Sequence, residues 1–452
     1  MKVRLALFIF LALALALFSS VSELNNFHTE SDNGLTILGK IILEAESDSV
    51  FHQLLPVING ENYITAGSTN CEVEISSVMQ LRDLEFSILT ISPAENLVAG
   101  DSLQIVLEGD CQEEVELYRH AESFLKMYIA LFPELAEREN WRDVEPAQPN
   151  ILYIYPDTDE PSFWQAFDYL LEWKKQKGFK VYQYAANNPS SQSIKDYIQN
   201  AYDTWEDPPE YVCLIGDAGG NYNIPTSYFG NGEGDHYYTT LAGEDQISDV
   251  HIGRLSFDNI LQWQSIVYKT VMYEREPYID NPDWFSRALL VGDPTSSGMS
   301  CVYTNINIRE SIEHNYPEYD YLELYDYPFQ PAMRLMVDMG VSYFNYRGYG
   351  GMSGWYDGTA NYLTNGMMLP FAVISTCATG DFAGTEGCRS EAFLQAGSPS
   401  NPRGAIGAIG TATITTHTCF NNCFVTGVAY GLFSDKLQTL GASHTRGKTS
   451  LF

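Results

Sequence analysis

The sequence is poor in positive charge. Lysine and arginine together number 25, against 58 aspartate and glutamate residues, so the 452-residue chain carries a formal net charge of −33 with histidine neutral. An excess of negative charge on this scale repels phosphate backbones and anionic lipid surfaces. The composition therefore argues against nucleic acid as a partner and favours a soluble, well-solvated surface.

Long apolar runs are also scarce, and the one clear example lies at the start of the chain. Lys2 and Arg4 precede the apolar residues 5–18, and small residues follow at 20–22. This order is typical of a signal peptide, and the run is short for a membrane span. We therefore expect a signal peptide over residues 1–22 and an exported protein, secreted or at the cell surface, with no membrane span after cleavage.

Eight cysteines in an exported chain allow disulfide bonds. Cys71 and Cys111 lie in the same N-terminal segment and form the first candidate pair. Cys419 and Cys423 are four residues apart, so they either pair locally or pack on one helix face. Cys213 lies inside an apolar strand and is expected to be a buried free thiol.

The N-terminal part of the chain, residues 23–149, is expected to form a β-rich domain with a helical linker. Short alternating segments separated by Asn, Gly and Asp predict a small antiparallel β domain, with strands near 71–75, 84–89 and 103–107. Apolar residues at helical spacing predict a helix within 116–139. The segment Pro146-Ala147-Gln148-Pro149 then indicates a linker.

From residue 150 onward, apolar strands alternate with helical patterns. Such alternation predicts a parallel sheet with helices on its faces. One round of the pattern ends in Gly216-Asp217, and a second round has a strand ending in Gly292-Asp293. We therefore expect two similar α/β subdomains, at 150–284 and 285–452.

Two apolar strands of the second subdomain are followed by residues that carry chemistry. The strand Val341–Tyr346 leads into Arg347-Gly348-Tyr349-Gly350-Gly351, and the strand Leu369–Thr376 leads into Cys377. In an open α/β sheet, functional groups lie just past the carboxyl ends of the strands. We therefore expect Tyr349 and Cys377 to lie together, with Cys377 as a free-thiol nucleophile that is not bridged to Cys388.

These two strand ends resemble those of the gingipain family of cysteine peptidases, peptidase family C25, over roughly residues 150–452. The resemblance implies a caspase-like α/β fold, protein or peptide substrates and no certain cofactor, and it leaves a structural calcium ion open. In the family, a histidine general base stands in Gly-His-Gly after the first strand, and the nucleophilic cysteine follows the second. Here Tyr349 occupies the histidine position and Cys377 the cysteine position.

The resemblance implies roles for further residues. Gly350 would donate its backbone N–H to the oxyanion, together with the backbone N–H of Cys377. Asp293 lies past the strand after which relatives have a carboxylate that orients the histidine. From the residues alone, Asp293 is better interpreted as a strand-end turn residue. His417 lies on a loop that lines the specificity pocket in relatives and could approach Cys377, although a lone histidine is more often exposed.

Two other segments are interpreted by the same resemblance. Arg254, in an Ile-Gly-Arg segment, is expected to pair with a carboxylate. The resemblance implies that the N-terminal domain acts as a prosegment or packing domain. Relatives continue beyond the position of Phe452, so the chain is interpreted as potentially truncated at its C-terminus.

The tyrosine favours an inactive protein, whereas the retained cysteine and glycines favour an active peptidase. A cysteine thiol has an ordinary pKa of about 8.5 and needs a base near neutrality, whereas a phenol, with an ordinary pKa of about 10, accepts a proton poorly. Three hypotheses follow: a cysteine endopeptidase acting through Cys377, an inactive pseudopeptidase that binds or scaffolds, and a sortase-like transpeptidase. If Tyr349 is fully buried, Tyr349→Ala should cost about 3–5 kcal/mol of stability.

Overall fold

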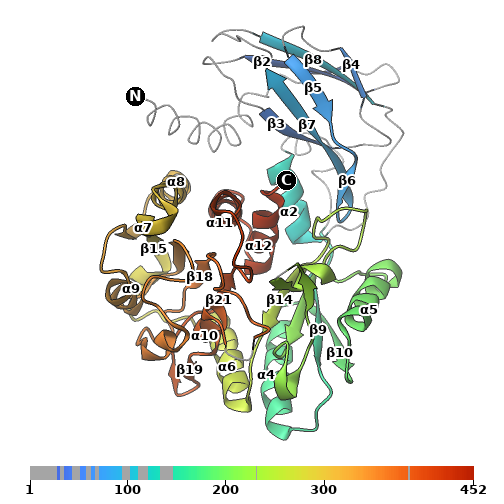
Figure 1. The fold of residues 1–452 in the computed structure, drawn as a ribbon. Helices are drawn as coiled ribbons and strands as arrows, with labels where there is room; N and C mark the ends of the chain where they lie inside the picture. The colour runs from blue at the N-terminus through green and yellow to red at the C-terminus, as the bar shows by residue number, and fades with distance from the viewer. Residues whose placement is uncertain are drawn as a thin grey trace. The chain divides into compact units, whose positions relative to one another are not determined.

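The computed structural model describes residues 28–30, 35–42, 51–56, 63–66, 71–93, 102–109, 121–132, 146–230, 232–384 and 387–452 (Figure 1). The predicted signal peptide and Cys111 lie outside these residues, so the signal peptide and the Cys71–Cys111 pair stay predictions. Within the described ranges, no helix has the length and apolar character needed to cross a membrane.

The chain separates into two compact units. The first contains residues 1–120, 128–145 and 242–249, and the second contains the remainder. The described strands of the first unit all pair antiparallel, as predicted. They are β1 (His28–Glu30), β2 (Leu35–Ile42), β3 (Phe51–Pro56), β4 (Tyr63–Ala66), β5 (Cys71–Ile75), β6 (Met79–Leu81), β7 (Leu84–Pro93) and β8 (Ser102–Gly109).

Residues 242–249 are held to the first unit by carboxylates that accept backbone N–H groups. Asp249 Oδ1 accepts from Arg82 N at 2.7 Å, and Asp245 Oδ2 accepts from Gln80 N at 2.6 Å. The Arg82 guanidinium also donates to Asp249 O at 2.8 Å. A segment far along the sequence is thereby joined to strand β6.

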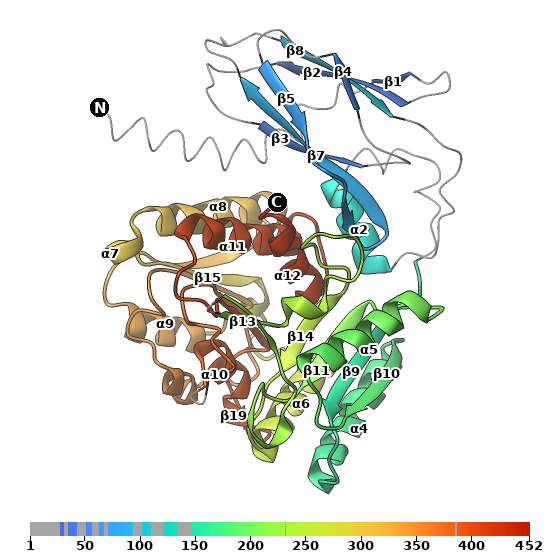
Figure 2. The same cartoon turned by 45° about the vertical axis from the view of Figure 1, so that its right-hand side comes forward.

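The first sheet of the second unit is parallel throughout, in the order β10-β9-β11-β14. Its strands are β9 (Asn150–Pro156), β10 (Lys180–Ala186), β11 (Tyr211–Ile215) and β14 (His251–Leu255). Helices α4 (Pro161–Gln176) and α6 (Ile260–Arg275) pack on one face of this sheet, and α5 (Ser191–Thr204) packs on the other (Figures 1 and 2).

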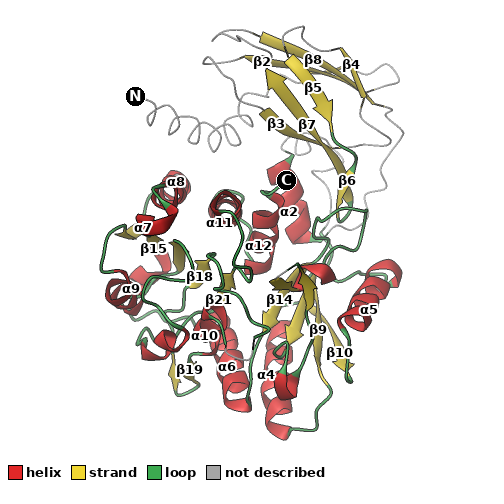
Figure 3. Cartoon of the chain, viewed as in Figure 1, coloured by secondary structure: helices red, strands yellow, loops and turns green. Residues whose placement is uncertain are grey.

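The second sheet is also parallel, in the order β16-β15-β17-β18-β21. Its strands are β15 (Arg287–Gly292), β16 (Asp320–Leu324), β17 (Tyr343–Arg347), β18 (Phe371–Ile374) and β21 (Gly407–Gly410). Helices α8 (Ser300–Asn315) and α11 (Thr418–Phe433) cover one face, and α9 (Phe329–Asp338) and α10 (Arg389–Gln395) cover the other (Figure 3).

The two sheets share one topology. In each, the second strand along the chain lies at the edge, the first lies inside it, and the third and fourth follow. The predicted pair of similar parallel α/β subdomains is therefore confirmed. The inner strands β9, β15 and β18 are nearly continuous apolar runs because helices bury both faces of the sheets.

Shorter elements complete the described chain. They are α2 (Glu122–Leu131), α7 (Pro294–Ser297), α12 (Leu440–Thr449), β12 (Ser227–Phe229), β13 (Gly232–Gly234), β19 (Gly397–Ser398), β20 (Asn401–Pro402), and the 3-10 turns η2 (Gly220–Tyr222), η3 (Asp235–Tyr238), η4 (Pro282–Ser286) and η5 (Asp357–Tyr362). Helix α2 lies inside the predicted helical stretch.

Arg254 of β14 pairs with a carboxylate, as the sequence predicts. Its Nε donates to Asp235 Oδ2 at 2.9 Å, and its Nη2 donates to Asp235 Oδ1 at 2.7 Å. Its Nη1 donates to the carbonyls of Gly216 and Ile224. This buried, bidentate pair holds the loops that follow β11.

The two sheets are joined by polar contacts of α10 and α6. Ser256, just after β14, donates to Glu391 Oε1 of α10 at 2.5 Å, and the Cys388 N–H donates to Glu391 Oε2 at 3.0 Å. Lys269 of α6 donates to the carbonyls of Leu394, Ala396 and Arg403. Burial lowers the pKa of Lys269 to about 7 and raises that of Glu391 from 4.5 to about 6.

The Glu391 shift predicts a pH-dependent contribution to stability. Because the folded pKa lies above the unfolded value, Glu391 favours folding most below pH 4.5, and this contribution is lost as pH rises through 6. Its size is about 2 kcal/mol. We expect Glu391→Gln, whose amide oxygen can accept from Cys388 N–H while its NH2 group donates to Ser256 Oγ, to gain in stability relative to the parent as pH rises from 4.5 to 7 in urea titrations. A pH-independent difference would contradict this.

The turn after β18 lies in close backbone contact with the end of β21. A Cβ atom placed on Gly380 would lie 2.6 Å from Gly410 C, and one placed on Gly410 would lie 2.6 Å from Gly380 N. Neither contact is tolerable, so both positions require glycine. The close approach fixes the loop that carries Cys377.

We therefore expect Gly380→Ala to destabilise the protein by about 1–3 kcal/mol, because backbone atoms must separate to admit the methyl group. Gly358→Ala is the matched control, since a Cβ there would have no neighbour within 4 Å. Chemical denaturation of the two variants should show a loss for Gly380→Ala alone. Equal stabilities would refute the close contact.

Candidate active site

The parallel register of β17 and β18 places Tyr349 and Cys377 at the same level. Tyr343 pairs with Phe371, and each candidate residue lies six positions beyond its own member of that pair. Both therefore emerge at the carboxyl edge of the sheet, where functional groups of open α/β sheets gather. Both line a pocket of about 220 Å³, together with Gly350, Gly351, Ala378, Arg389 and Ile414.

Cys377 is a free, half-buried thiol on a tightly held turn. Ala378 N donates to Thr413 O at 3.2 Å, and Gly380 N donates to Thr411 O at 3.1 Å. Ala378 has φ +56°, in the left-handed region that residues with a Cβ seldom adopt. The prediction that Cys377 is free is confirmed: Cys388 is also free and is buried at the start of α10.

The conformation of the loop that carries Tyr349 depends on two glycines. Gly350 and Gly351 have φ +59° and +82°, a conformation that favours glycine. Gly351 N donates to Cys377 O at 2.9 Å, which ties this loop to the cysteine turn. Tyr349 is exposed, at 67% of its surface, so the premise that it is buried is corrected: the chain leaves the core at this position.

Asp293 forms hydrogen bonds that connect the end of β15 to the same loop. It is buried, its Oδ1 accepts from Thr295 N at 2.9 Å at the start of α7, and its Oδ2 accepts from Ser353 Oγ. Ser353 N in turn donates to the Tyr346 hydroxyl at 2.9 Å. The geometry is that of the strand-end turn residue that the sequence favours, with an added contact to the loop after β17.

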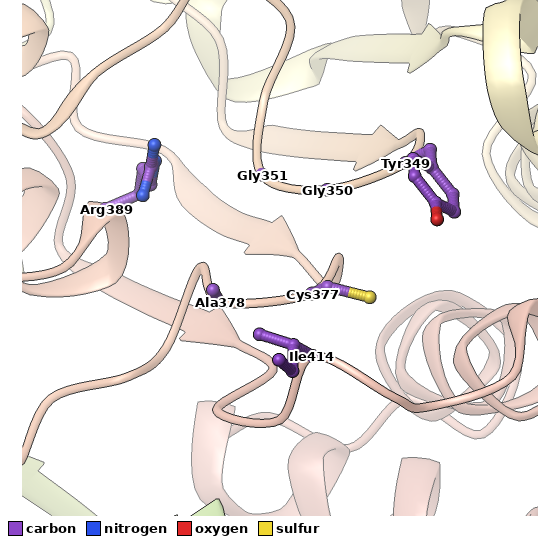
Figure 4. A pocket seen from close by; sticks show the side chains of 7 residues that line it. All are labelled: Tyr349, Gly350, Gly351, Cys377, Ala378, Arg389 and Ile414. Atoms are coloured by element: carbon purple, nitrogen blue, oxygen red, sulfur yellow. The ribbon is translucent and has the colours of Figure 1, made fainter.

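Two backbone donors point to oxyanion chemistry. Among the described residues, neither Gly350 N–H nor Cys377 N–H donates a hydrogen bond to a protein acceptor. Unused backbone N–H groups beside a nucleophile are the usual means of holding a developing oxyanion. Figure 4 shows the Tyr349 ring and the Cys377 sulfur extending to the same side of the pocket, with Arg389 at the opposite end.

A buried cation lies behind the cysteine turn. The Arg347 guanidinium is 1% exposed; it donates to Ser375 O, to Asn422 Oδ1 at 2.8 Å and to Thr418 O at 3.4 Å. Burial lowers the pKa of Arg347, while negative charge at Cys301 or Cys377 would favour its charged form. Arg347 thus stabilises the segment before Cys377 through hydrogen bonds made in the interior of the protein.

His417 does not reach the pocket of Cys377. It caps helix α11, where its Nδ1 accepts from Cys419 N at 3.2 Å and lies 3.0 Å from Cys419 Sγ. Cys419 and Cys423 are free thiols, four residues apart on α11. Cys213 is also free, and burial raises its pKa to about 12.

The sequence analysis missed Arg389, whereas Ile414 lies on the loop 413–417 that the resemblance places at the specificity pocket. Arg389 follows Cys377 by twelve residues, and no local pattern marks it. Within the described residues, no three His, Cys, Asp or Glu side chains gather as metal ligands do.

Comparison with known proteins agrees with this geometry. A sequence model of peptidase family C25 matches residues 144–452. The chain belongs to peptidase family C25. Gingipain R2 of Porphyromonas gingivalis is 23% identical over 425 residues, which cover 86% of this chain and 56% of that protein. Lys-gingipain W83 of the same organism is 24% identical over 79% of this chain and 21% of its own length.

The C25 fold is also found in solved structures. Crystalline gingipain R (RgpB), described as an Arg-specific cysteine proteinase, has a TM-score of 0.60 at 20% identity and covers 67% of this chain and 72% of its own. The complex of the Porphyromonas gingivalis RgpB pro- and mature domains gives 0.60 at 21% identity, with 67% and 74% covered. The caspase-like α/β fold is thereby confirmed, while the chain spans about half the length of gingipain R2 and less of Lys-gingipain W83.

The exposure of Tyr349 gives a direct prediction. Tyr349→Ala should change the free energy of unfolding by no more than about 0.5 kcal/mol, because an exposed side chain contributes little packing. Tyr346→Ala is the matched control on the same strand end, where a fully buried ring should cost about 3–5 kcal/mol. A comparable loss in both, measured by urea denaturation, would show that Tyr349 packs after all.

Proposed function

We propose that the chain is an exported cysteine endopeptidase of protein or peptide substrates, with Cys377 as its nucleophile. The observation that carries the proposal is the pocket itself, which joins a free, accessible thiol to two unused backbone N–H groups. Membership of family C25 supports the same reaction class. The basic and apolar leader supports export.

The proposed reaction is acyl transfer. The Cys377 sulfur attacks the peptide carbonyl carbon after its proton passes to solvent, and the carbonyl oxygen accepts from Gly350 N–H and Cys377 N–H. The amine leaves with a proton, and water then hydrolyses the thioester. In relatives a histidine would transfer these protons; here Tyr349 offers a phenol O–H that can donate a hydrogen bond but accepts a proton poorly. We therefore expect slow turnover.

A second candidate is a pseudopeptidase that binds peptides without cleaving them. It is favoured by one observation: among the described residues, no side chain forms a hydrogen bond with Cys377 Sγ. A proton acceptor that should stand within hydrogen-bond reach is therefore lacking in the described site. The two candidates differ in whether Cys377 reacts with a peptide electrophile.

Labelling by peptidyl acyloxymethyl ketones with varied side chains tests the proposal. We expect covalent addition at Cys377, identified by mass spectrometry, and loss of addition in Cys377→Ala. Cys419→Ala is the matched control, since Cys419 is the half-exposed thiol that contacts an imidazole, and it should label as the parent does. Absence of any labelling, with the fold intact by circular dichroism, would favour the binding module.

Tyr349→His should raise activity, because the flanking glycines already present this position beside Cys377. A positioned general base typically raises the reaction rate about 10²–10⁴-fold. The rate should be measured on a mixed peptide library, and the gain should vanish in the Tyr349→His, Cys377→Ala double variant. Tyr356→His, at a 70% exposed tyrosine that does not line the pocket, is the matched control. No gain in Tyr349→His would mean that the pocket cannot accept a substrate carbonyl at the sulfur.

A further inference from the structure

The pocket beside Cys377 contains one permanent charge, the guanidinium of Arg389. The Arg389 side chain is 22% exposed. Among the described residues, none of its nitrogens donates a hydrogen bond, and its Nε is buried without an acceptor. Its charge is balanced in part by Asp357, whose Oδ1 lies 3.4 Å from Nε without hydrogen-bond geometry. The donors of Arg389 are therefore unused.

Arg389 is placed by the loop that also places the oxyanion donors. A Cβ atom on Gly351 would lie 3.5 Å from Arg389 Nη2, so the guanidinium lies against this glycine. Gly351 N is itself bound to Cys377 O. The wall of the pocket thus runs continuously from the cysteine, along the glycines, to the guanidinium at the other end (Figure 4).

We propose that this pocket binds a carboxylate of the substrate through Arg389. The carboxylate belongs either to an Asp or Glu side chain directly before the attacked bond, or to a free chain terminus. This inference rests on the proposed function of Cys377 and adds to it the substrate class. Arg389 is then a specificity-determining residue, while Cys377 remains the reacting group.

The chemistry of the pocket favours an anion over the alternatives. A guanidinium with free donors pairs with a carboxylate through parallel hydrogen bonds. A Lys or Arg side chain would meet like charge, and an apolar side chain would leave the donors without acceptors. Ala378 and Ile414 offer apolar surface for the methylene groups of an acidic side chain. The chain's net negative charge is screened within about 8 Å at physiological ionic strength. The charge that a bound side chain meets in the pocket is therefore that of Arg389.

The test compares peptidyl acyloxymethyl ketones that differ only in the residue next to the reactive group: Asp, Glu, Asn, Gln and Lys. The rate of addition to Cys377 is measured by mass spectrometry on the full chain. We expect Asp or Glu to react about 10–100-fold faster than its amide counterpart. Arg389→Gln should remove this preference, Arg389→Lys should retain part of it, and Arg275→Gln, a charge loss at an exposed site on α6, should leave it unchanged.

A second arm distinguishes the source of the carboxylate. Peptides with a free or an amidated C-terminus are tested for protection of Cys377 from iodoacetamide in the parent and in Arg389→Gln. Protection by the free acid alone, lost in Arg389→Gln, assigns the site to chain termini. Preference for Asp or Glu ketones assigns it to side chains.

Two outcomes separate the inference from the proposed function. If Lys, Asn or Gln ketones label Cys377 as fast as Asp and Glu, and free acids give no extra protection, the carboxylate pocket is refuted while the nucleophile stands. If no ketone labels Cys377 but free acids still protect it through Arg389, the peptidase proposal fails and the carboxylate site stands. If neither occurs, both are refuted.

Discussion

The parallel pairing of β17 with β18 is the constraint on which the rest of the site depends. Because Tyr343 lies opposite Phe371, strands β17 and β18 end at the same level of the sheet, and Cys377 lies beside the glycine loop. A slip of one residue would exchange the faces of β18 and move Phe371 and Val373 into the places of Ala372 and Ile374, where side chains of different size and shape would not fit the packed core. The register is therefore fixed by the core, and the position of Cys377 follows from it.

Much of this could be predicted from the sequence, for a physical reason. Strands buried on both faces leave continuous apolar runs, as in Ala288–Val291 and Phe371–Ile374, and the glycines after them mark the sheet edge. Strand β16 was missed because it is an edge strand whose acidic residues, Asp320 and Glu323, interrupt the apolar pattern. Edge strands face solvent and lack the composition that identifies central ones.

The exposure of Tyr349 and the position of Arg389 could not be predicted in the same way. The residues up to Gly348 are buried, and only the backbone turn at Gly350 shows that the tyrosine side chain leaves the core. Arg389 reaches the pocket because α10 begins beside the glycine loop, which is a tertiary contact between segments far apart in sequence. Periodicity reports which face of an element is buried, and it carries no information on such contacts.

The scarce basic residues of this acidic chain include several buried cations. Lys269 and Arg347 lie in the interior and donate chiefly to backbone carbonyls, and Arg254 pairs with Asp235. The carbonyl acceptors around Arg347 satisfy its buried guanidinium without neutralising it, so Arg347 adds positive potential inside a negatively charged protein, whereas Asp235 balances the charge of Arg254. Arg347 does so directly behind the turn that carries Cys377.

Side-chain burial also bears on the choice of tyrosine at position 349. Tyr349 is exposed and the adjacent glycines supply the backbone shape, so packing does not require a tyrosine there. The Ile414 side chain, which also lines the pocket, is likewise 69% exposed. Large apolar side chains left exposed at or near a pocket commonly mark a binding surface. Stability therefore does not explain the tyrosine, and we propose instead that it contacts a bound peptide, whichever fate Cys377 gives to that peptide.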